Sequence, residues 1–249
     1  MQKIKVENIF AQDWIRMFAH LANLFFEQCE IITEDAENAS QVDFIISELE
    51  GNKISGKAIL TYEGTNFEAT FSEIAADGDA KDKSRQLKRI YSHVFLEVLE
   101  QATGMKQSWG ILTGIRPMKL YHKYRREGFS SEEAIEEIMK NYRVSREKGE
   151  LLAKIAAIQL RSVPDLYDLK EEVSIYIGIP FCPTKCAYCT FPAYAIRRKS
   201  GRVESFLDGL HEEIREMGKW LTEKDMKITT IYFGGGTPTS IEAEEMDEL

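Results

Sequence analysis

Three of the four cysteines in this 249-residue chain lie within eight consecutive residues. Cys182, Cys186 and Cys189 have the spacing C-x3-C-x2-C, so their side chains belong to one short loop. Thiolates this close together can bind a single inorganic centre, and iron–sulfur clusters are held by cysteine thiolates, usually four of them. A loop with three thiolates would leave one iron of a 4Fe-4S cluster without a protein ligand and free to bind another molecule.

Other uses of these cysteines fit the spacing less well. A structural zinc site usually takes four ligands, often from two C-x2-C pairs. The chain has no second pair, and the nearest histidine, His211, falls inside a predicted helix. A disulfide is typical of small secreted chains, and a redox pair of Cys186 and Cys189 would leave Cys182 without a role. The fourth cysteine, Cys29, lies between the apolar pairs 25–26 and 31–32 and is predicted to be structural.

The residues around the loop predict a strand–helix–strand unit. The apolar, β-branched run 173–181 precedes the loop and is typical of a buried strand. An amphipathic helix is predicted at about 202–221, and a second buried strand at 228–233 runs into the glycine-rich stretch 234–239. Strands joined in this way are parallel, so the cysteine loop and the glycine stretch should both follow carboxyl ends of strands. Such sheets bind ligands at that edge.

The two motifs resemble those of a known family. Tyr-Ile-Gly-Ile-Pro-Phe-Cys at 176–182 and Phe-Gly-Gly-Gly-Thr-Pro-Thr at 233–239 are similar to the radical S-adenosylmethionine (SAM) superfamily and, more narrowly, to the oxygen-independent coproporphyrinogen III oxidase/dehydrogenase group. The resemblance implies that the 4Fe-4S cluster is bound by Cys182, Cys186 and Cys189. It also implies that SAM is contacted by Tyr176, Tyr188, Gly234, Gly235, Gly236 and Thr237. Glycines suit this role because backbone groups without side chains can approach a ligand closely.

A third stretch narrows the resemblance. Gly-Ile-Arg-Pro at 114–117 is similar to the amino-terminal region of the HemZ type within this group. Pro117 suits the first turn of a helix to about 126, and Arg116 and Lys119 would flank its amino end, where either an anion contact or a structural role is open. The chain departs from the group at Gly178, where His is common, and at Thr190-Phe191, where some relatives have Cys-Gly-Cys. Because of these two departures, the resemblance does not specify how the substrate is protonated or whether a second SAM binds.

The chain divides into three predicted regions. Residues 1–104 form an α+β region, with a helix at 13–28, a strand meander at 42–49, 53–62 and 65–72, and a helix at 79–102. Residues 105–170 form a helical connecting region, in which Ser130 and Ser145 are predicted helix caps. A polar linker at 165–172 leads into 171–249, the start of a radical SAM (β/α) barrel. A six-unit partial barrel needs roughly 190 residues, so we expect this barrel to be incomplete and the fold class to be α/β with an apparently truncated barrel.

Composition excludes several classes of protein. The net charge of −9 argues against a generic nucleic-acid binder. The longest apolar helix candidate, 13–28, contains Arg16, His20 and Asn23, so no membrane span is predicted. No signal peptide is predicted, and a cluster with an exposed iron suits a reducing compartment, so we expect a cytoplasmic protein.

The resemblance implies a function in haem biosynthesis. SAM cleavage would yield a 5′-deoxyadenosyl radical that removes hydrogen from a propionate; loss of carbon dioxide and one electron then leaves a vinyl group. Two such steps convert coproporphyrinogen III, a tetrapyrrole, into protoporphyrinogen IX. The residues do not identify the electron donor. The alternatives are a haem chaperone-like radical SAM protein and a radical SAM enzyme acting on another substrate. A basic run could bind propionates, or could be a solvated flank: Arg197, Arg198, Lys199 and Arg202.

Overall fold

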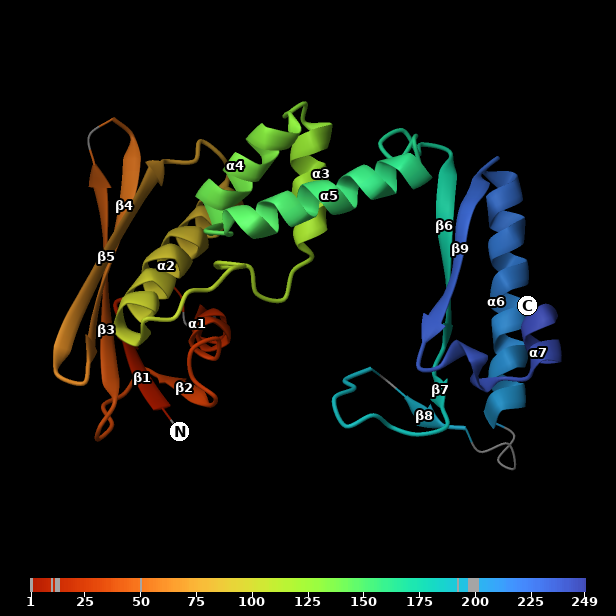
Figure 1. Cartoon of the computed structure of the whole chain (residues 1–249), viewed down its shortest axis with the longest axis horizontal. Helices are drawn as coiled ribbons and strands as arrows, with labels where there is room; N and C mark the ends of the chain where they lie inside the picture. Colours follow the sequence, from red (N-terminus) through yellow and green to blue (C-terminus); the bar gives the residue numbers. More distant parts are fainter. Residues whose placement is uncertain (1, 10, 12–13, 50, 192, 197–201) are drawn as a thin grey trace. The chain divides into compact units, whose positions relative to one another are not determined.

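The computed structural model describes residues 2–9, 11, 14–49, 51–191, 193–196 and 202–249 (Figure 1). The chain forms two compact units, Met1–Pro164 and Asp165–Leu249. The division falls at the start of the polar stretch 165–172, and the first unit holds both the α+β region and the helices that follow it. No helix within the described ranges is long and apolar enough to cross a membrane.

The first unit contains a five-stranded sheet of order β2-β1-β3-β4-β5. Its strands are Gln2–Glu7 (β1), Cys29–Ile32 (β2), Ser40–Leu49 (β3), Lys53–Tyr62 (β4) and Thr65–Ile74 (β5). The antiparallel pairs β3–β4 and β4–β5 confirm the predicted meander. Strands β1 and β2 were not predicted; β1 runs parallel to both β2 and β3, so the sheet is mixed.

Two helices pack on this sheet. Helix α1 (Ile15–Ala22) is shorter than the predicted helix at 13–28, of which residues 12–13 lie outside the described residues. The chain turns after Ala22 because the Asn23 side chain accepts a hydrogen bond from the backbone N–H of Cys29 at 2.9 Å, and Cys29 then begins β2. Helix α2 (Ala80–Thr103) matches the predicted helix at 79–102, and the Asp79 carboxylate caps its first turn.

The core of this sheet and helix layer is apolar and aromatic. Its largest buried side chains come from the sheet, from α1 with the residue before it, and from α2. They are Ile4, Phe44 and Leu60; Trp14, Phe18 and Leu21; and Phe95 and Leu99. Gly56 of β4 faces α2, and a Cβ at this position would lie 2.3 Å from a methyl carbon of Ile90. The glycine therefore lets the helix approach the sheet closely.

Three helices form the second part of this unit: Pro117–Arg126 (α3), Ser131–Tyr142 (α4) and Arg146–Ser162 (α5). The predicted caps are confirmed, because Ser130 and Glu133 form a reciprocal capping box and Ser145 accepts a hydrogen bond from the N–H of Lys148. The three helices share a core of Tyr121, Ala134, Ile135, Ile138, Val144, Leu152 and Ala156.

Polar contacts connect these helices to α2. Arg143, at the end of α4, donates to Glu97 and Glu100, both at 2.9 Å. The Nε2 atom of His93 lies 2.8 Å from the carbonyl oxygen of Asn141, and the His93 ring stacks on Phe71. The His93 side chain is buried.

The second unit is built on a two-stranded parallel sheet. Glu172–Ile179 (β6) pairs with Lys227–Gly235 (β9), and α6 (Arg202–Glu223) connects them, which confirms the predicted strand–helix–strand order. Two short strands that were not predicted, Phe181–Cys182 (β7) and Tyr194–Ala195 (β8), also pair in parallel. A 3-10 turn at Pro238–Ser240 and helix α7 (Ala243–Asp247) follow β9.

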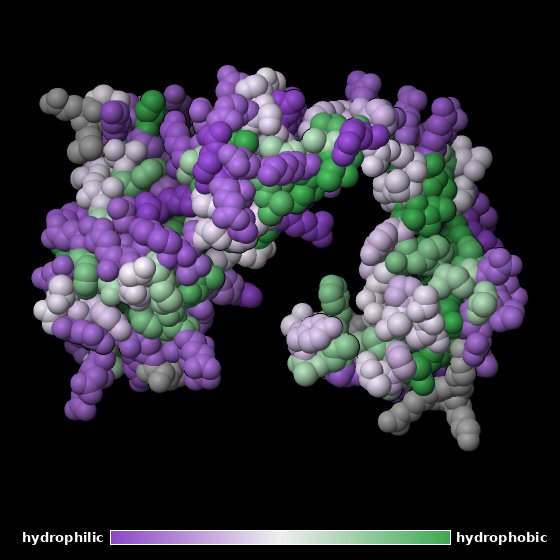
Figure 2. Space-filling model, in the orientation of Figure 1, coloured by the Kyte–Doolittle hydropathy of each residue, from purple (hydrophilic) through white to green (hydrophobic). Residues whose placement is uncertain are grey.

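Only one face of this sheet is covered within the described residues. Ile177 and Ile179 of β6 pack with Val203 and Leu207 of α6, whereas the other face presents Tyr176 and Tyr232 at 61% and 65% exposure. The sequence of both strands is typical of buried strands, and in this chain one face of their sheet is exposed. Figure 2 shows apolar surface over β6 and β9.

Candidate functional site

The cysteine loop and the glycine stretch lie at the same edge of the β6–β9 sheet. In the parallel register, Gly178 pairs with Gly234 and Ile179 with Gly235, so both strands end together. The N–H of Gly236 donates to the carbonyl oxygen of Ile179 at 2.9 Å, and the N–H of Thr237 donates to that of Phe181 at 2.8 Å. The predicted meeting of the two motifs at the carboxyl ends of parallel strands is confirmed.

Cys182 contacts the glycine stretch directly. The hydroxyl of Thr237 donates to the Cys182 sulfur at 3.4 Å, and the Cys182 side chain is half-buried. The carbonyl oxygen of Cys182 accepts a hydrogen bond from the N–H of Ile196 at 3.1 Å, which anchors the end of the loop. The first cysteine of the motif is therefore held in place from two sides.

The three glycines allow tight packing at this edge. A Cβ on Gly236 would lie 2.8 Å from both the Cys182 sulfur and the carbonyl oxygen of Phe181. Gly235 has a φ of +106°, and a Cβ there would lie 2.7 Å from the carbonyl oxygen of Ile179. A Cβ on Gly234 would lie 2.4 Å from the Tyr176 hydroxyl. Contacts with backbone atoms thus require Gly235 and Gly236, whereas a side chain at Gly234 would meet only the Tyr176 side chain.

The other two cysteines differ in exposure. Cys186 is exposed and Cys189 is half-buried, and the N–H of Cys189 donates to the carbonyl oxygen of Cys186 at 3.1 Å. Tyr188 is 87% exposed, and a hydrogen bond with the Cys186 thiol raises the pKa of its hydroxyl. Among the described residues, no three His, Cys, Asp or Glu side chains are gathered as a metal site, so the three thiols share a loop without converging.

Tyr232 was not among the site residues predicted from the sequence. Its ring stacks on that of Tyr176 with centroids 5.6 Å apart, on the open face of the sheet. A signal was present, because Tyr176-Ile177-Gly178 and Tyr232-Phe233-Gly234 repeat the pattern Tyr-x-Gly in two strands expected to be parallel. The pair places two aromatic rings beside Gly178 and Gly234, next to the edge where both motifs end.

Cys29 and the basic run at 197–202 were also singled out in the sequence. Cys29 lies on β2 of the first unit, and burial raises the pKa of its thiol to about 11, which keeps it protonated at neutral pH. This agrees with a structural role. Arg197, Arg198 and Lys199 lie outside the described residues, and Arg202 begins α6.

The donor set fits an iron–sulfur cluster. The loop offers three thiols and no competing carboxylate or imidazole within 182–189, and thiolates are the ligands that such clusters take. Cys182 is already held against Gly236 and Thr237. Metal binding is coupled to folding, because a preformed site rarely exists in the unfolded chain. The exposed positions of Cys186 and Tyr188 leave this part of the loop accessible.

No model of a known protein family matches the chain. Comparison with known proteins finds 50% identity to the oxygen-independent coproporphyrinogen-III oxidase-like protein HemZ of Bacillus subtilis, over 99% of this chain and 49% of HemZ. The heme chaperone HemW of Bacillus subtilis is 41% identical over 76 residues, which is 30% of this chain and 19% of HemW. Oxygen-independent coproporphyrinogen III oxidase of Pseudomonas aeruginosa is 32% identical over 91 residues, which is 36% of this chain and 19% of that protein.

The lengths of these matches differ. The chain spans about half the length of HemZ. The matches to HemW and to the Pseudomonas aeruginosa oxidase each cover 19% of the length of that relative. The match to HemZ extends along nearly the whole chain, and therefore includes the first unit as well as the cysteine loop. The resemblance that the motifs indicated is confirmed: this chain is similar over nearly its whole length to the HemZ type of the oxygen-independent coproporphyrinogen III oxidase group.

Proposed function

We propose that this chain belongs to a radical SAM oxidoreductase that carries out the anaerobic oxidative decarboxylation of coproporphyrinogen III to protoporphyrinogen IX. The observation that carries this proposal is the contact between the two motifs, in which Cys182 lies against Gly236 and Thr237 at the ends of β6 and β9. This contact would place cluster and SAM side by side at one edge of the sheet.

The residues divide into two sets in this proposal. Cys182, Cys186 and Cys189 would hold the 4Fe-4S cluster, and SAM would be contacted by Tyr176, Tyr188, Gly234, Gly235, Gly236 and Thr237. When bound, the cluster supplies one electron for reductive cleavage of the SAM sulfonium. The protein would position and shield the reactive groups, as it does for other cofactors.

Several residues have roles that follow from their contacts. The Thr237 hydroxyl donates to the Cys182 sulfur, and hydrogen bonds to cluster sulfurs are one means of setting a reduction potential. The stacked rings of Tyr176 and Tyr232 give the sheet an aromatic face beside the glycines. We infer that this face helps to exclude water from the reacting groups, with SAM on the Tyr176 side.

A second candidate is a haem chaperone-like function. It is favoured by the 76-residue match to HemW, which has a higher identity than the match to the Pseudomonas aeruginosa oxidase. The two functions can be told apart by product formation, because the enzyme converts a tetrapyrrole substrate and a chaperone only binds one. A fourth relative, anaerobilin synthase of Escherichia coli O157:H7, is 33% identical over 75 residues, so a reaction on another substrate is a further option.

The test is anaerobic turnover of the whole protein with SAM, a chemical reductant and coproporphyrinogen III. We expect 5′-deoxyadenosine and vinyl-containing product to form together. 5′-Deoxyadenosine without vinyl product would indicate a different substrate. Stoichiometric haem binding without either product would favour the chaperone.

The cysteine assignment is tested separately. We expect Cys182→Ala, Cys186→Ala and Cys189→Ala each to lose the iron, sulfide and visible charge-transfer absorption of the anaerobically reconstituted protein. Cys29→Ala is the matched control and should keep them, because Cys29 belongs to another sheet and its thiol stays protonated. Full cluster content in Cys186→Ala would refute the assignment.

A further inference from the structure

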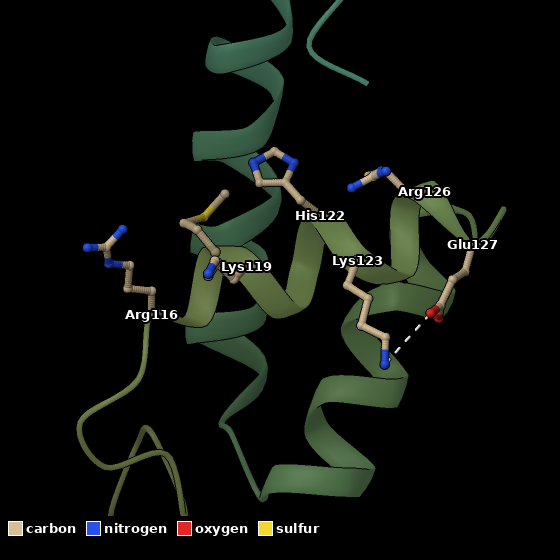
Figure 3. Close-up of a pocket in the computed structure, with 7 residues that line it drawn as sticks. Arg116, Lys119, His122, Lys123, Arg126 and Glu127 are labelled. Atoms are coloured by element: carbon tan, nitrogen blue, oxygen red, sulfur yellow. Dashed lines mark ion pairs between the residues drawn. The ribbon is translucent and has the colours of Figure 1, made fainter. Parts of the chain in front are cut away.

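The Gly-Ile-Arg-Pro stretch leads into a helix with an unusual charge pattern. Arg116 precedes α3, and Lys119, Lys123 and Arg126 follow at intervals of three, four and three residues. This spacing places all four cations along one face of the helix. All four side chains are exposed, and Figure 3 shows them along the length of α3.

These cations line a groove of about 560 Å³, together with Met118, His122 and Glu127 (Figure 3). A groove of this size falls in the range of small-molecule sites. The His122 Nε2 atom lies 2.8 Å from the side-chain oxygen of Gln159 on α5, which orients the imidazole in the groove. The groove thus combines a positive rim with an apolar thioether and an aromatic ring.

The positive charge in the groove is poorly balanced by the protein itself. Its one carboxylate among the described lining residues, Glu127, lies 3.7 Å from Lys123. Within the part of the chain that the structure describes, Arg116, Lys119 and Arg126 have no ion-pair partner. Like charges three or four residues apart destabilise a helix. A chain with a net charge of −9 therefore concentrates unneutralised positive charge at one groove, where an anion would relieve the repulsion.

The neighbouring helices restrict the shape of that anion. Helices α4 and α5 expose carboxylates next in sequence to α3, namely Glu132, Glu133, Glu136, Glu147 and Glu150. Exposed carboxylates on two helices that share a core with α3 disfavour the approach of an extended polyanion such as a nucleic acid strand. The row of cations spans about 15 Å, given the rise of a ten-residue helix. Charge and length both favour a compact molecule that carries several carboxylates.

We propose that the α3 groove, formed by Arg116, Lys119, Lys123 and Arg126, binds a small polycarboxylate through charge-assisted hydrogen bonds. Arginine often binds a carboxylate through two parallel hydrogen bonds, and these are stronger than hydrogen bonds between neutral groups. A tetrapyrrole with four propionates matches the four cations, and this particular ligand rests on the function proposed above. The groove would then bind the substrate before it reaches the candidate site at β6 and β9. It is formed by residues of the first unit alone.

The experiment is a fluorescence titration of the whole protein with coproporphyrin III, a stable tetracarboxylate, at low and at moderate salt. We expect saturable binding that weakens with salt, and no binding of the tetramethyl ester. The variant Lys119→Gln/Arg126→Gln should bind roughly tenfold more weakly for each lost contact. The matched control is Lys140→Gln/Lys154→Gln, which removes two exposed lysines from α4 and α5 and should bind as the wild type does.

Citrate and a single-stranded oligonucleotide are added as competitors. Displacement by millimolar citrate would support the polycarboxylate chemistry and point to a smaller ligand. Equal binding by the two double variants, equal binding of the ester, or stronger displacement by the oligonucleotide would overturn the proposal. Circular dichroism of each variant shows that it is folded. Failure of SAM cleavage with normal groove binding would count against the proposed function alone.

Discussion

Gly236 lies where the two motifs of the candidate site touch. A side chain here would come within 2.8 Å of the Cys182 sulfur and of the Phe181 carbonyl oxygen. The carbonyl belongs to the backbone of β7 and cannot rotate away as a flexible side chain could. The position therefore couples the glycine stretch to Cys182, the first cysteine of the motif, through steric contact.

We predict that Gly236→Ala displaces Cys182 and lowers the iron and sulfide content of the reconstituted protein by at least half. Overpacking of this kind also costs about 1–3 kcal/mol of folding free energy. The measurements are iron and sulfide per chain and the urea midpoint. The control is Gly209→Ala on α6, where a Cβ meets nothing within 4 Å. Equal cluster content in both variants would contradict the steric coupling.

At the residue scale, the sequence predicted the thiols and the glycines but not their arrangement. The spacing of Cys182, Cys186 and Cys189 predicts a shared loop, and the structure has one. The stacking of Tyr176 on Tyr232 depends on strand register, which two separate sequence segments do not specify without a pairing partner. The packing role of Gly236 likewise depends on the path of β7, a two-residue strand too short to show a pattern.

The contact between α2 and the end of α4 relies on a buried charge. Glu100 is 5% exposed and accepts hydrogen bonds from Arg143 and from the N–H of Gln107. Burial raises the pKa of Glu100, but these donors outweigh it, and the net pKa is lowered. Arg143 itself has a φ of 58°, in the left-handed region, so the end of α4 is shaped to present this side chain.

We predict that Arg143→Ala destabilises the first unit by about 2 kcal/mol, because it leaves the Glu100 charge with fewer partners in a buried place. Arg146→Ala is the control, since Arg146 pairs with Glu132 and Glu150 at the surface, where ion pairs contribute roughly 0–1 kcal/mol. Urea unfolding followed by circular dichroism measures both. A loss in Arg143→Ala no larger than in Arg146→Ala would show that the pair is not important for stability.

His93 connects three elements and should make stability depend on pH. Burial lowers the pKa of His93 to about 4, and the positive charges of Arg143 and Arg89 act in the same direction. The hydrogen bond to the Asn141 carbonyl raises this pKa but does not outweigh burial. The unfolded chain, with a histidine pKa near 6.5, binds the proton first as the pH falls. The stabilisation is therefore present above about pH 6.5 and is lost between that value and pH 4.

We predict that this histidine accounts for about 2 kcal/mol of the stability lost between pH 7 and pH 5. His93→Gln lacks the titration, so its unfolding free energy should change less over this interval than that of the wild type. His20→Gln removes an exposed histidine of α1 and should retain the wild-type pH dependence. The measurement is urea unfolding at the two pH values. An unchanged pH dependence in His93→Gln would exclude this role.

At the element scale, long periodic segments were predictable and short ones were not. Helix α2 and the meander β3–β5 have strong patterns and clear caps or turns. Strand β1 alternates Ile4 and Val6 with polar residues, but six residues give a weak signal. The continuing apolar residues Leu24 and Phe25 favoured a longer α1, whereas the Asn23 side chain ends it through a hydrogen bond to Cys29. Such a tertiary contact overrides local preference.

At the scale of the whole molecule, the two units differ in how well they are covered. The first unit has two apolar clusters built from its own residues. The second has a smaller cluster on one face of a two-stranded sheet, and it leaves Tyr176, Ile231 and Tyr232 more than half exposed. A two-stranded sheet needs further packing to be stable. The second unit should therefore be the less stable part of residues 1–249.

We predict that residues 1–249 unfold in two steps, with the second unit first, at a midpoint roughly 1 M urea below that of the first. Trp220 is the one tryptophan of 165–249, whereas Trp14 and Trp109 belong to the first unit. Fluorescence of the wild type should show both steps, and Trp220→Phe should lose the early one. Far-UV circular dichroism should keep both steps in that variant, because α6 still unfolds early. One transition, with the same midpoint for both probes, would mean that the units unfold as a single cooperative body.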